Sequence, residues 1–233
     1  MYNGRTILGI IPARGGSKGI PHKNIIDLCG KPLISYSVIA GLASKYIDYL
    51  MVSTDDEEIA KVAKEYGAEV PFMRPAELAS DTSRTIDAVL HVLENLKKQG
   101  QLYDVLVLLQ PTQPLRTSTD IDHAIERYFE MGCKSLVSVS PVDDHPLLIR
   151  SIERDVLVPL LKRPSTCRRQ DMPPYYRING CIYINEVGQI DENTSFNDNI
   201  VPFVMGKEHS IDIDESSDLV MARYYIGLKN KND

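Results

Sequence analysis

The chain has 233 residues, of which 43% are hydrophobic and 25% are charged, and its formal net charge is −6 at pH 7. This length and composition predict one sizeable globular core in one or two domains. The acidic balance argues against a nucleic acid partner, because binding a phosphate backbone requires a basic face.

The cysteines and the N-terminus point to an ordinary intracellular protein. The four cysteines are scattered without a C-x-x-C pair, which disfavours a zinc site or a disulfide framework. No charged segment followed by a long apolar stretch opens the chain, and no run of about 18 apolar residues occurs. We expect a cytoplasmic protein that neither spans nor binds a membrane.

Strands and helices are expected to alternate over the first 140 residues. The strands are predicted at apolar runs, and the helices between them begin at prolines or capping residues and end at glycines. The predicted strands cover 6–13, 49–54, 69–74, 105–110 and 135–140. The predicted helices cover 31–44, a segment from a capping box at Thr54–Glu57 to Gly67, 84–100 and 117–132. Such βαβ units predict a mostly parallel sheet.

The pattern changes at residue 141. Residues 141–180 contain six of the fourteen prolines and few helical signals, which predicts an excursion from the main sheet. Strand patterns return at 181–187, 200–206 and 210–214, and a last helix is predicted over 215–230. The expected organisation is one domain, with a core formed by 1–140 and 181–233 and with 141–180 inserted into it.

The segment after the first strand, IPARGGSKGIPHKN (11–24), combines glycines with cations. Gly15, Gly16 and Gly19 allow backbone N–H groups to approach a phosphate, and the neighbouring Arg and Lys side chains supply positive charge. Ligands gather at the carboxyl ends of strands in open α/β sheets. We therefore predict a phosphate-binding loop, although it matches neither a Walker A loop nor a dinucleotide fingerprint.

Two further polar patterns indicate ligand binding. Asp212 and Asp214 alternate along the predicted strand 210–214, so both carboxylates are expected on one face. Carboxylates, water and phosphate oxygens suit Mg²⁺, which predicts a metal site; the alternative for Asp214 is a cap of the last helix. Gln110 ends a buried strand, where its amide either contacts a ligand or caps the turn at Pro111.

These residues fall within five motifs that resemble, in order, those of the acylneuraminate cytidylyltransferases, the CMP-sialic acid synthetases. The first is I-P-A-R-x-x-S-K-G-x-x-x-K-N. It is followed by RPAELASDTSRT (74–85), LLQPTQPLRT (108–117), RRQDMPPYYRINGCIYI (168–184) and SIDIDESSDL (210–219). The resemblance extends from residue 6 to about residue 222, which is nearly the whole chain.

The resemblance implies a reaction in which the anomeric hydroxyl of a sugar acid attacks the α-phosphorus of CTP and pyrophosphate leaves. It implies a three-layer α/β/α, Rossmann-like nucleotidyltransferase sheet, mostly parallel, with a small protruding dimerisation element at 141–180. It also implies a homodimer that uses Mg²⁺, with Mn²⁺ as the alternative ion.

The resemblance also assigns roles to individual residues. The catalytic residues would be Arg14, Lys18, Lys23 and Asp212, and the metal ligands Asp212 and Asp214. The nucleotide would be bound by Arg14, Gly15, Gly16, Ser17, Lys18, Lys23, Asn24, Arg74, Ser83 and Thr85. The sugar would be bound by Gln110, Arg168, Arg169, Arg177, Asn179, Tyr183 and Phe196. The choice between Arg168 and Arg169 for the sugar carboxylate stays open, as does the contribution of a partner subunit.

The sequence departs from the family motifs at two positions, and three other functions were weighed against this one. Gln113 stands where the family usually has serine, and Ser195 where it often has an aromatic residue. A Kdo cytidylyltransferase also opens with I-P-A-R but lacks the S-K-G-x-x-x-K-N continuation. An inactive nucleotide-binding regulatory module would not need Lys18, Asp212 and Asp214, and an oxidoreductase has no fingerprint here. The sugar is left open between N-acetylneuraminic, legionaminic and pseudaminic acids.

Overall fold

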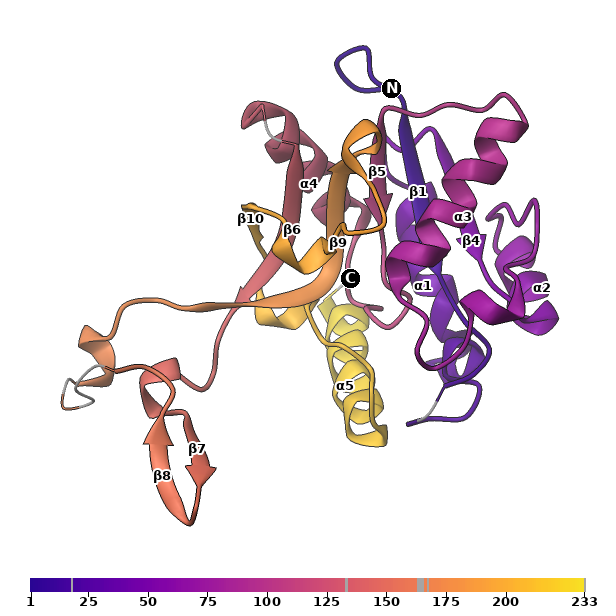
Figure 1. The fold of residues 1–233 in the computed structure, drawn as a ribbon. Coiled ribbons are helices and arrows are strands. Elements are labelled where there is room, and N and C mark those ends of the chain that lie inside the picture. The colour runs from indigo at the N-terminus through magenta and orange to yellow at the C-terminus, as the bar shows by residue number, and fades with distance from the viewer. Residues whose placement is uncertain (18, 133, 163–165, 167, 233) are drawn as a thin grey trace.

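The computed structural model describes residues 1–17, 19–132, 134–162, 166 and 168–232, and its centre is a six-stranded sheet (Figure 1). The strand order is β10-β6-β9-β5-β1-β4. The strands are β1 (Ile7–Pro12), β4 (Tyr49–Ser53), β5 (Val105–Leu108), β6 (Ser135–Pro141), β9 (Tyr176–Glu186) and β10 (Val201–Val204). All neighbours are parallel except β9, which runs antiparallel between β5 and β6. The prediction of a mostly parallel sheet is confirmed.

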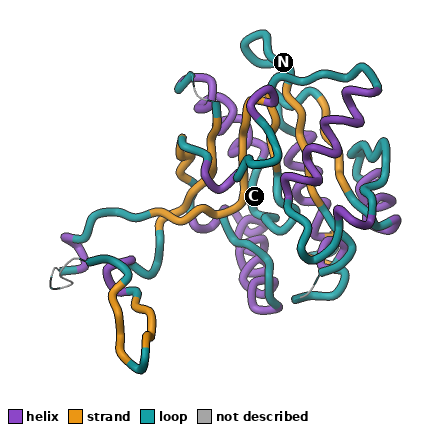
Figure 2. The backbone as a smooth tube through the Cα atoms, in the orientation of Figure 1, coloured by secondary structure: helices purple, strands orange, loops and turns teal. Residues whose placement is uncertain are grey.

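Helices cover both faces of this sheet, as Figure 2 shows. They are α1 (Leu33–Leu42), α2 (Glu57–Glu65), α3 (Thr85–Lys98), α4 (Ser118–Glu130) and α5 (Ser216–Asn232). Alternate side chains of β1 separate the faces: Ile7 and Ile11 pack in one cluster with α1, α2 and α4, whereas Leu8 and Ile10 pack with α3. This arrangement confirms the three-layer α/β/α architecture.

The helix ends follow the predicted glycines more closely than the helix starts follow the predicted caps. Gly67, Gly100 and Gly132 end α2, α3 and α4 with φ angles of +94°, +77° and +53°. The predicted capping box at the start of α2 is wrong. The N-cap is Asp56, whose carboxylate accepts from the N–H groups of the second and third helical residues, and Thr54 Oγ1 instead accepts from the N–H of Asp56.

Two predicted strands are absent from the described residues. Segment 69–74 makes one parallel bridge, between Glu69 and Met51, and then leaves the sheet edge at Pro71, which has no N–H to donate. Segment 210–214 is unpaired, and it is held by a hydrogen bond from the N–H of Ile213 to the carbonyl of Thr112 and by Lys23 Nζ, which donates to the carbonyl of Ile213. Both segments look like strands because they alternate, yet 69–74 pairs with β4 only at Glu69, and 210–214 pairs with no strand among the described residues.

The excursion is a protruding arm that carries its own hairpin (Figure 1). The hairpin strands are β7 (Arg150–Glu153) and β8 (Val156–Pro159), joined by two residues with left-handed φ angles, Arg154 and Asp155. The predicted boundaries need correction, because β6 and β9 remain paired out to Pro141 and Tyr176. Residues 176–180 therefore belong to the main sheet.

The remaining elements are short. A two-strand ribbon pairs β2 (Asp27–Leu28) with β3 (Lys31–Pro32). Turns of 3-10 helix lie at Lys23–Ile25, Ala76–Leu78, Pro146–Leu148, Arg169–Asp171, Val187–Gln189, Phe196–Asp198 and Lys207–His209. None of the helices among the described residues has the length and apolar character that crossing a membrane requires.

Candidate active site

The glycine-rich loop lies at the carboxyl end of β1, where two of its glycines touch other parts of the site. A Cβ on Gly15 would lie 2.6 Å from Oδ2 of Asp56, and a Cβ on Gly19 would lie 2.4 Å from the main-chain oxygen of Asp214. The N–H of Gly15 donates to Asp55 Oδ1 at 3.0 Å. The glycines are thus needed for close approach, and they bring the opening loop against the segment that contains Asp214.

The cations of this loop already have anionic partners. Arg14 Nη1 lies 3.0 Å from Asp81 Oδ1 and donates to the carbonyl of Ser80. Lys23 Nζ donates to Asp214 Oδ1 and to the carbonyl of Ile213, both at 2.9 Å. The third predicted cation, Lys18, lies outside the described residues.

Two adjoining cavities hold the described residues that were predicted to bind the nucleotide, except Gly15 and Gly16. The larger, of about 420 Å³, is lined by Pro12, Arg14, Ser17, Gly19, Lys23, Asn24, Gln110, Pro111, Thr112, Asp214 and Glu215. The smaller, of about 170 Å³, is lined by Pro12, Arg14, Arg74, Leu78, Ser80, Ser83, Arg84, Thr85, Ala88 and Gln110. Gly16 is exposed in the loop nearby. Residues from Pro12 to Glu215 therefore meet around one opening, although they are far apart in the sequence.

Two buried side chains give the nucleotide side its fixed shape. Arg74 is 7% exposed and its guanidinium donates to the hydroxyl and carbonyl of Ser53, and burial lowers its pKa. Asn24 is 5% exposed and donates to the carbonyl of Arg14, while its Oδ1 is buried without a partner. An unpartnered oxygen of this kind is available to a ligand donor.

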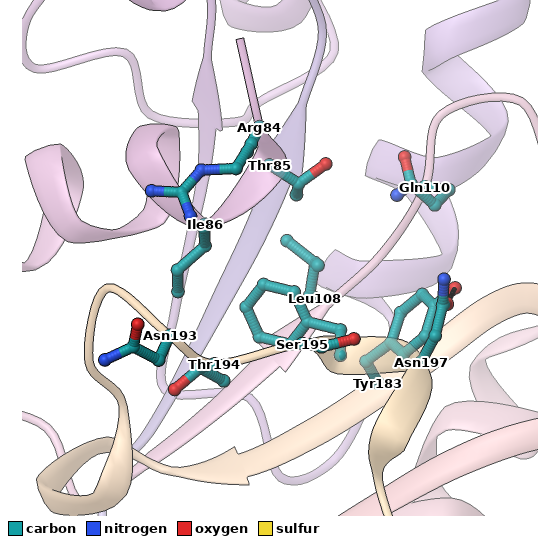
Figure 3. A pocket seen from close by; sticks show the side chains of 11 residues that line it. Arg84, Thr85, Ile86, Leu108, Gln110, Tyr183, Asn193, Thr194, Ser195 and Asn197 are labelled. Atoms are coloured by element: carbon teal, nitrogen blue, oxygen red, sulfur yellow. Dashed lines mark hydrogen bonds between the residues drawn. The ribbon is translucent and has the colours of Figure 1, made fainter.

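A third cavity, of about 370 Å³, opens beside Gln110 (Figure 3). Its walls come from the start of α3 and from the loop after β9, which are joined by a hydrogen bond from Arg84 Nη1 to the carbonyl of Glu192. It is lined by Arg84, Thr85, Ile86, Leu108, Gln110, Tyr183, Asn193, Thr194, Ser195, Phe196 and Asn197. Gln110 lines this cavity and both nucleotide-side cavities, so it stands where the three meet.

The antiparallel strand β9 places Tyr183 at the same sheet edge as the parallel strands. Tyr183 pairs in register with Leu108, the last residue of β5. Its hydroxyl donates to Asn197 Oδ1 at 3.0 Å, its ring lies 6.0 Å from that of Phe196, and burial raises its pKa to about 12. Tyr183 is therefore a neutral hydroxyl held by a neighbouring amide.

A fourth cavity, of about 270 Å³, gathers two of the four remaining predicted sugar residues, Arg177 and Asn179. It is lined by Arg177, Ile178, Asn179, Gly180, Tyr183, Asn197 and Asp212. Asn179 is 5% exposed, and its Oδ1 accepts from the Ser138 hydroxyl and from the N–H of Cys181. The hydroxyl of Ser140 accepts from Arg177 Nε at 3.4 Å.

The two predicted metal ligands do not share a cavity. Asp212 lines the fourth cavity and Asp214 the larger nucleotide cavity, and the segment that carries them is not a strand, so the predicted strand geometry is wrong. Burial raises the pKa of Asp212, the nearby charge of Asp214 adds to that rise, and a hydrogen bond from Thr112 opposes it. The two carboxylates are close enough to influence each other while pointing into adjoining spaces.

The first arginines of the fourth motif lie away from these cavities in this chain. Arg168 pairs with Asp171 at 2.7 Å and its side chain is 75% exposed. The backbone of Arg169 begins a 3-10 turn on the protruding arm, and its side chain lies outside the described residues. Arg168 lines none of the described cavities of its own chain, and among the described side chains Arg177 is the arginine of that motif at the site.

Several lining residues were not predicted from the sequence. They are Arg84, Thr112, Asn193, Thr194 and Asn197. Arg84 and Thr112 stand inside the quoted motifs, next to predicted residues, and this position was the available signal. The loop 193–197 carries no pattern of its own, because its position depends on how it folds back over β9 and α3.

The arrangement suits transfer of a group between two bound anions. Cations and backbone amides line one side, Arg84 and otherwise neutral groups line the other, and Gln110 stands between them. Such a site works by positioning and by electrostatic stabilisation of a leaving group, without a covalent intermediate on the protein.

Comparisons with known proteins agree with this chemistry. The family described as "Cytidylyltransferase" matches residues 8–200. The chain is 39% identical to "CMP-N,N'-diacetyllegionaminic acid synthase" of Legionella pneumophila, covering 97% of this chain and 98% of that protein. It is 35% identical to "Pseudaminic acid cytidylyltransferase" of Campylobacter jejuni, covering 93% and 94%.

The fold is also found among solved structures. A CMP:2-keto-3-deoxy-manno-octonic acid synthetase complexed with CTP superposes with a TM-score of 0.72 at 16% sequence identity, covering 96% of this chain and 99% of that one. An identity this low supports the shared fold alone. The full-length sequence matches above 30% go further, and they confirm the resemblance that the five motifs indicated. The chain belongs to the cytidylyltransferase family and is a nucleotidyltransferase of the CMP-sialic acid synthetase type.

Proposed function

We propose that this enzyme transfers the cytidylyl group of CTP to the anomeric hydroxyl of a nonulosonic acid. The hydroxyl oxygen bonds to the α-phosphorus, the bond from that phosphorus to the bridging oxygen breaks, and pyrophosphate leaves. The hydroxyl proton passes to solvent or to a nearby base. Because CTP is the donor, we expect the reaction to take place in the cytoplasm.

The observation that carries the proposal is the place of Gln110 at the junction of three cavities. On one side, Arg14 and Lys23 supply the charge that a triphosphate needs. On the other, Tyr183 and neighbouring amides line a cavity of about 370 Å³ with hydrogen-bonding groups that suit a polyhydroxylated, acylated sugar. A reacting hydroxyl held beside Gln110 would lie next to the phosphate chain.

Magnesium fits the donor set only in combination with the substrate. Among the described residues there is no group of three or more His, Cys, Asp or Glu side chains that could hold a metal. Asp212 and Asp214 provide two carboxylates, and Mg²⁺ at nucleotide sites commonly uses one or two carboxylates with phosphate oxygens and water. When bound, the ion would neutralise phosphate charge and lower the pKa of a coordinated hydroxyl. We propose Mg²⁺, with Mn²⁺ as the alternative.

The protruding arm supports a homodimer. Its hairpin exposes large apolar side chains, with Ile152 74% exposed, Val156 62%, Leu157 65% and Leu160 60%. An arm with this surface packs on little of its own chain, and we propose that a second copy covers it. Arg168, on the same arm, would then be available to the partner's site. Molar mass by light scattering checks the proposal: a monomer at micromolar concentration would contradict it.

The identity of the sugar acid is the part that sequence identity does not decide. The two relatives at 39% and 35% identity carry names with different acids, legionaminic and pseudaminic. The structural neighbour named for 2-keto-3-deoxy-manno-octonic acid shares only the fold. We propose the nonulosonic class as the substrate, with N,N'-diacetyllegionaminic acid as the first to test because that relative is the more similar of the two.

The test is pyrophosphate release from CTP with Mg²⁺ and each of four acids: N,N'-diacetyllegionaminic, pseudaminic, N-acetylneuraminic and Kdo. Release with one of the first three supports the proposal and identifies the substrate. Release with Kdo alone would replace it with the Kdo activity. Tight CTP binding without release from any acid would favour the regulatory binding module. A matched reaction with ATP or GTP in place of CTP controls for nucleotide specificity.

A further inference from the structure

Arg116 is a buried cation to which the sequence analysis assigns no role and which lines none of the four cavities described above. It lies six residues after Gln110, just before the N-cap of α4, and is only 3% exposed. Fully buried arginines are rare, because removing a guanidinium from water is costly unless its donors are satisfied.

The partners of Arg116 are neutral oxygens from three different elements. Nη1 donates to the carbonyl of Cys181 in β9 at 2.6 Å and to the carbonyl of Gln110 at 3.3 Å, and Nη2 donates to the Ser37 hydroxyl in α1 at 2.6 Å. No carboxylate of the described residues lies within ion-pair distance of the guanidinium, and Nε is buried without a partner. Burial lowers the pKa of Arg116 to about 10, so it stays charged at neutral pH.

The chain at Gln110 needs such an anchor. The ladder of β5 ends at Leu108, and Leu109 makes one more main-chain bond, from its N–H to the carbonyl of Ile10. The Gln110 carbonyl accepts from the Ser37 hydroxyl at 3.1 Å and from Arg116, so two side chains hold it in place of a strand.

The anchor joins the two strands that deliver ligand-facing residues. Through Gln110 the guanidinium holds the residue at the junction of three cavities, and through Cys181 it holds β9 two residues before Tyr183. Both carbonyls bind the same Nη1 atom, which fixes the spacing between the end of β5 and β9. A shift of that spacing would move the Gln110 amide relative to the cavities on either side.

We propose that Arg116 is a positioning residue, which acts through Gln110 to align the acceptor hydroxyl of the sugar acid with the α-phosphorus of CTP. This role rests on the proposed function. It is distinct from a role in folding alone, because its effect on turnover depends on the Gln110 side chain being present.

A double-mutant cycle tests the proposal. Arg116→Met and Arg116→Lys are made in the wild type and in Gln110→Ala, and kcat and KM are measured for the sugar acid and for CTP. We expect Arg116→Met to lower kcat by about tenfold to hundredfold, because small misplacements have effects of this size. Arg116→Lys should recover part of the loss, and the KM for CTP should change less than the KM for the sugar acid.

The cycle separates positioning from stability. In Gln110→Ala, Arg116→Met should cost less than about twofold further, because the residue through which it acts is gone. The same fold loss in both backgrounds would overturn the proposal. Ser44→Ala, which removes a buried hydrogen bond from the turn after α1 to Asp122 in α4, is the matched control and should leave kcat unchanged. If Arg116→Met does not fold, Ser37→Ala and Arg116→Lys carry the same cycle, with the same two outcomes.

A second readout needs no substrate and stands apart from the proposed function. Amide hydrogen exchange at Leu109 should quicken in Arg116→Lys and Arg116→Met relative to the wild type and to Ser44→Ala. Unchanged exchange at Leu109 would overturn the inference even in an active enzyme. Absence of pyrophosphate release by the wild type with every acid would instead overturn the proposed function.

Discussion

The nucleotide side of the active site carries charges that already have partners, whereas the sugar side is lined mainly by neutral groups that hold one another. Arg14 is paired with Asp81 and Lys23 with Asp214. Across the site, Tyr183 donates to Asn197, and Asn179 is held by Ser138. The first set of contacts has to be exchanged when an anion binds, while the second set can stay as it is.

This difference indicates how each side contributes to the reaction. Ion pairs near the surface contribute little to stability and open easily, so the nucleotide side can release its cations to a triphosphate at small cost. Buried hydrogen bonds are costly to break, so the sugar side is pre-shaped for its ligand. We expect substitutions on the two sides to affect different kinetic constants.

The largest effect is expected at Asp212, the carboxylate that lines the fourth cavity on the sugar side. Asp212→Asn should lower kcat by about hundredfold or more, because the variant keeps the shape but loses the charge that would hold the metal. The check is steady-state pyrophosphate release at saturating CTP, sugar acid and Mg²⁺. A kcat within a few fold of the wild type would remove Asp212 from the catalytic set.

Thermal unfolding provides the matched control for that variant. Burial raises the pKa of Asp212, so the folded state holds this proton more tightly than the unfolded state does. The stability contributed by the protonated form is therefore present at acid pH and is lost as pH rises through the raised pKa. Asp212→Asn should unfold at a temperature equal to or higher than that of the wild type at pH 8. A lower temperature would mean that the loss of activity comes from the fold.

The next largest effect is expected at Lys23 on the nucleotide side. Lys23→Met should weaken CTP binding by about tenfold to hundredfold, because hydrogen bonds to a charged group contribute about 1.5–3 kcal/mol. Calorimetric titration with CTP measures it. The KM for the sugar acid should change little, and an equal effect on both substrates would contradict the division between the two sides.

The sequence predicts some elements of the fold well and others poorly. Apolar runs such as 6–13 and 105–110 predict buried strands because nothing else suits so many apolar residues in a row, and Gly67, Gly100 and Gly132 predict helix ends because they adopt left-handed φ angles. Segments 69–74 and 210–214 mislead because alternation does not specify how far pairing extends: 69–74 leaves β4 after one bridge, and 210–214 pairs with no described strand.

The residues of the site also differ in how well the sequence predicts their proximity. Arg14, Lys23 and Asn24 lie within one short motif, so their proximity follows from local sequence. The wall made by Arg84 and the loop 193–197, and the anchor made by Arg116, depend on packing between elements distant in sequence. Alternation predicted that Asp212 and Asp214 face one side. The structure separates them, because an unpaired segment need not keep the pleat of a strand.

A smaller effect is expected from Tyr183→Phe, which removes one hydroxyl from the sugar side. The KM for the sugar acid should rise by about threefold to tenfold, because a single neutral hydrogen bond contributes about 0.5–1.5 kcal/mol. Calorimetric CTP affinity should stay at the wild-type value. A fall in CTP affinity as large as that in Lys23→Met would show that the two sides are not separate.

The smallest expected effect tests directly whether the ion pairs of the nucleotide side must open for CTP, because it concerns the partner of Lys23. Asp214 is 72% exposed at its side chain, so its ion pair with Lys23 is largely screened by water and contributes about 0–1 kcal/mol. Asp214→Asn frees Lys23 from that charge, and CTP binding without metal, in EDTA, should tighten by up to about fivefold. With Mg²⁺ present the same variant should need more metal for half-maximal activity, because one proposed carboxylate ligand is gone. Asp81→Asn offers the matched comparison at Arg14. If metal-free CTP affinity is unchanged in Asp214→Asn, then the exchange of partners costs nothing, and Lys23 is already as available to a phosphate as an unpaired lysine.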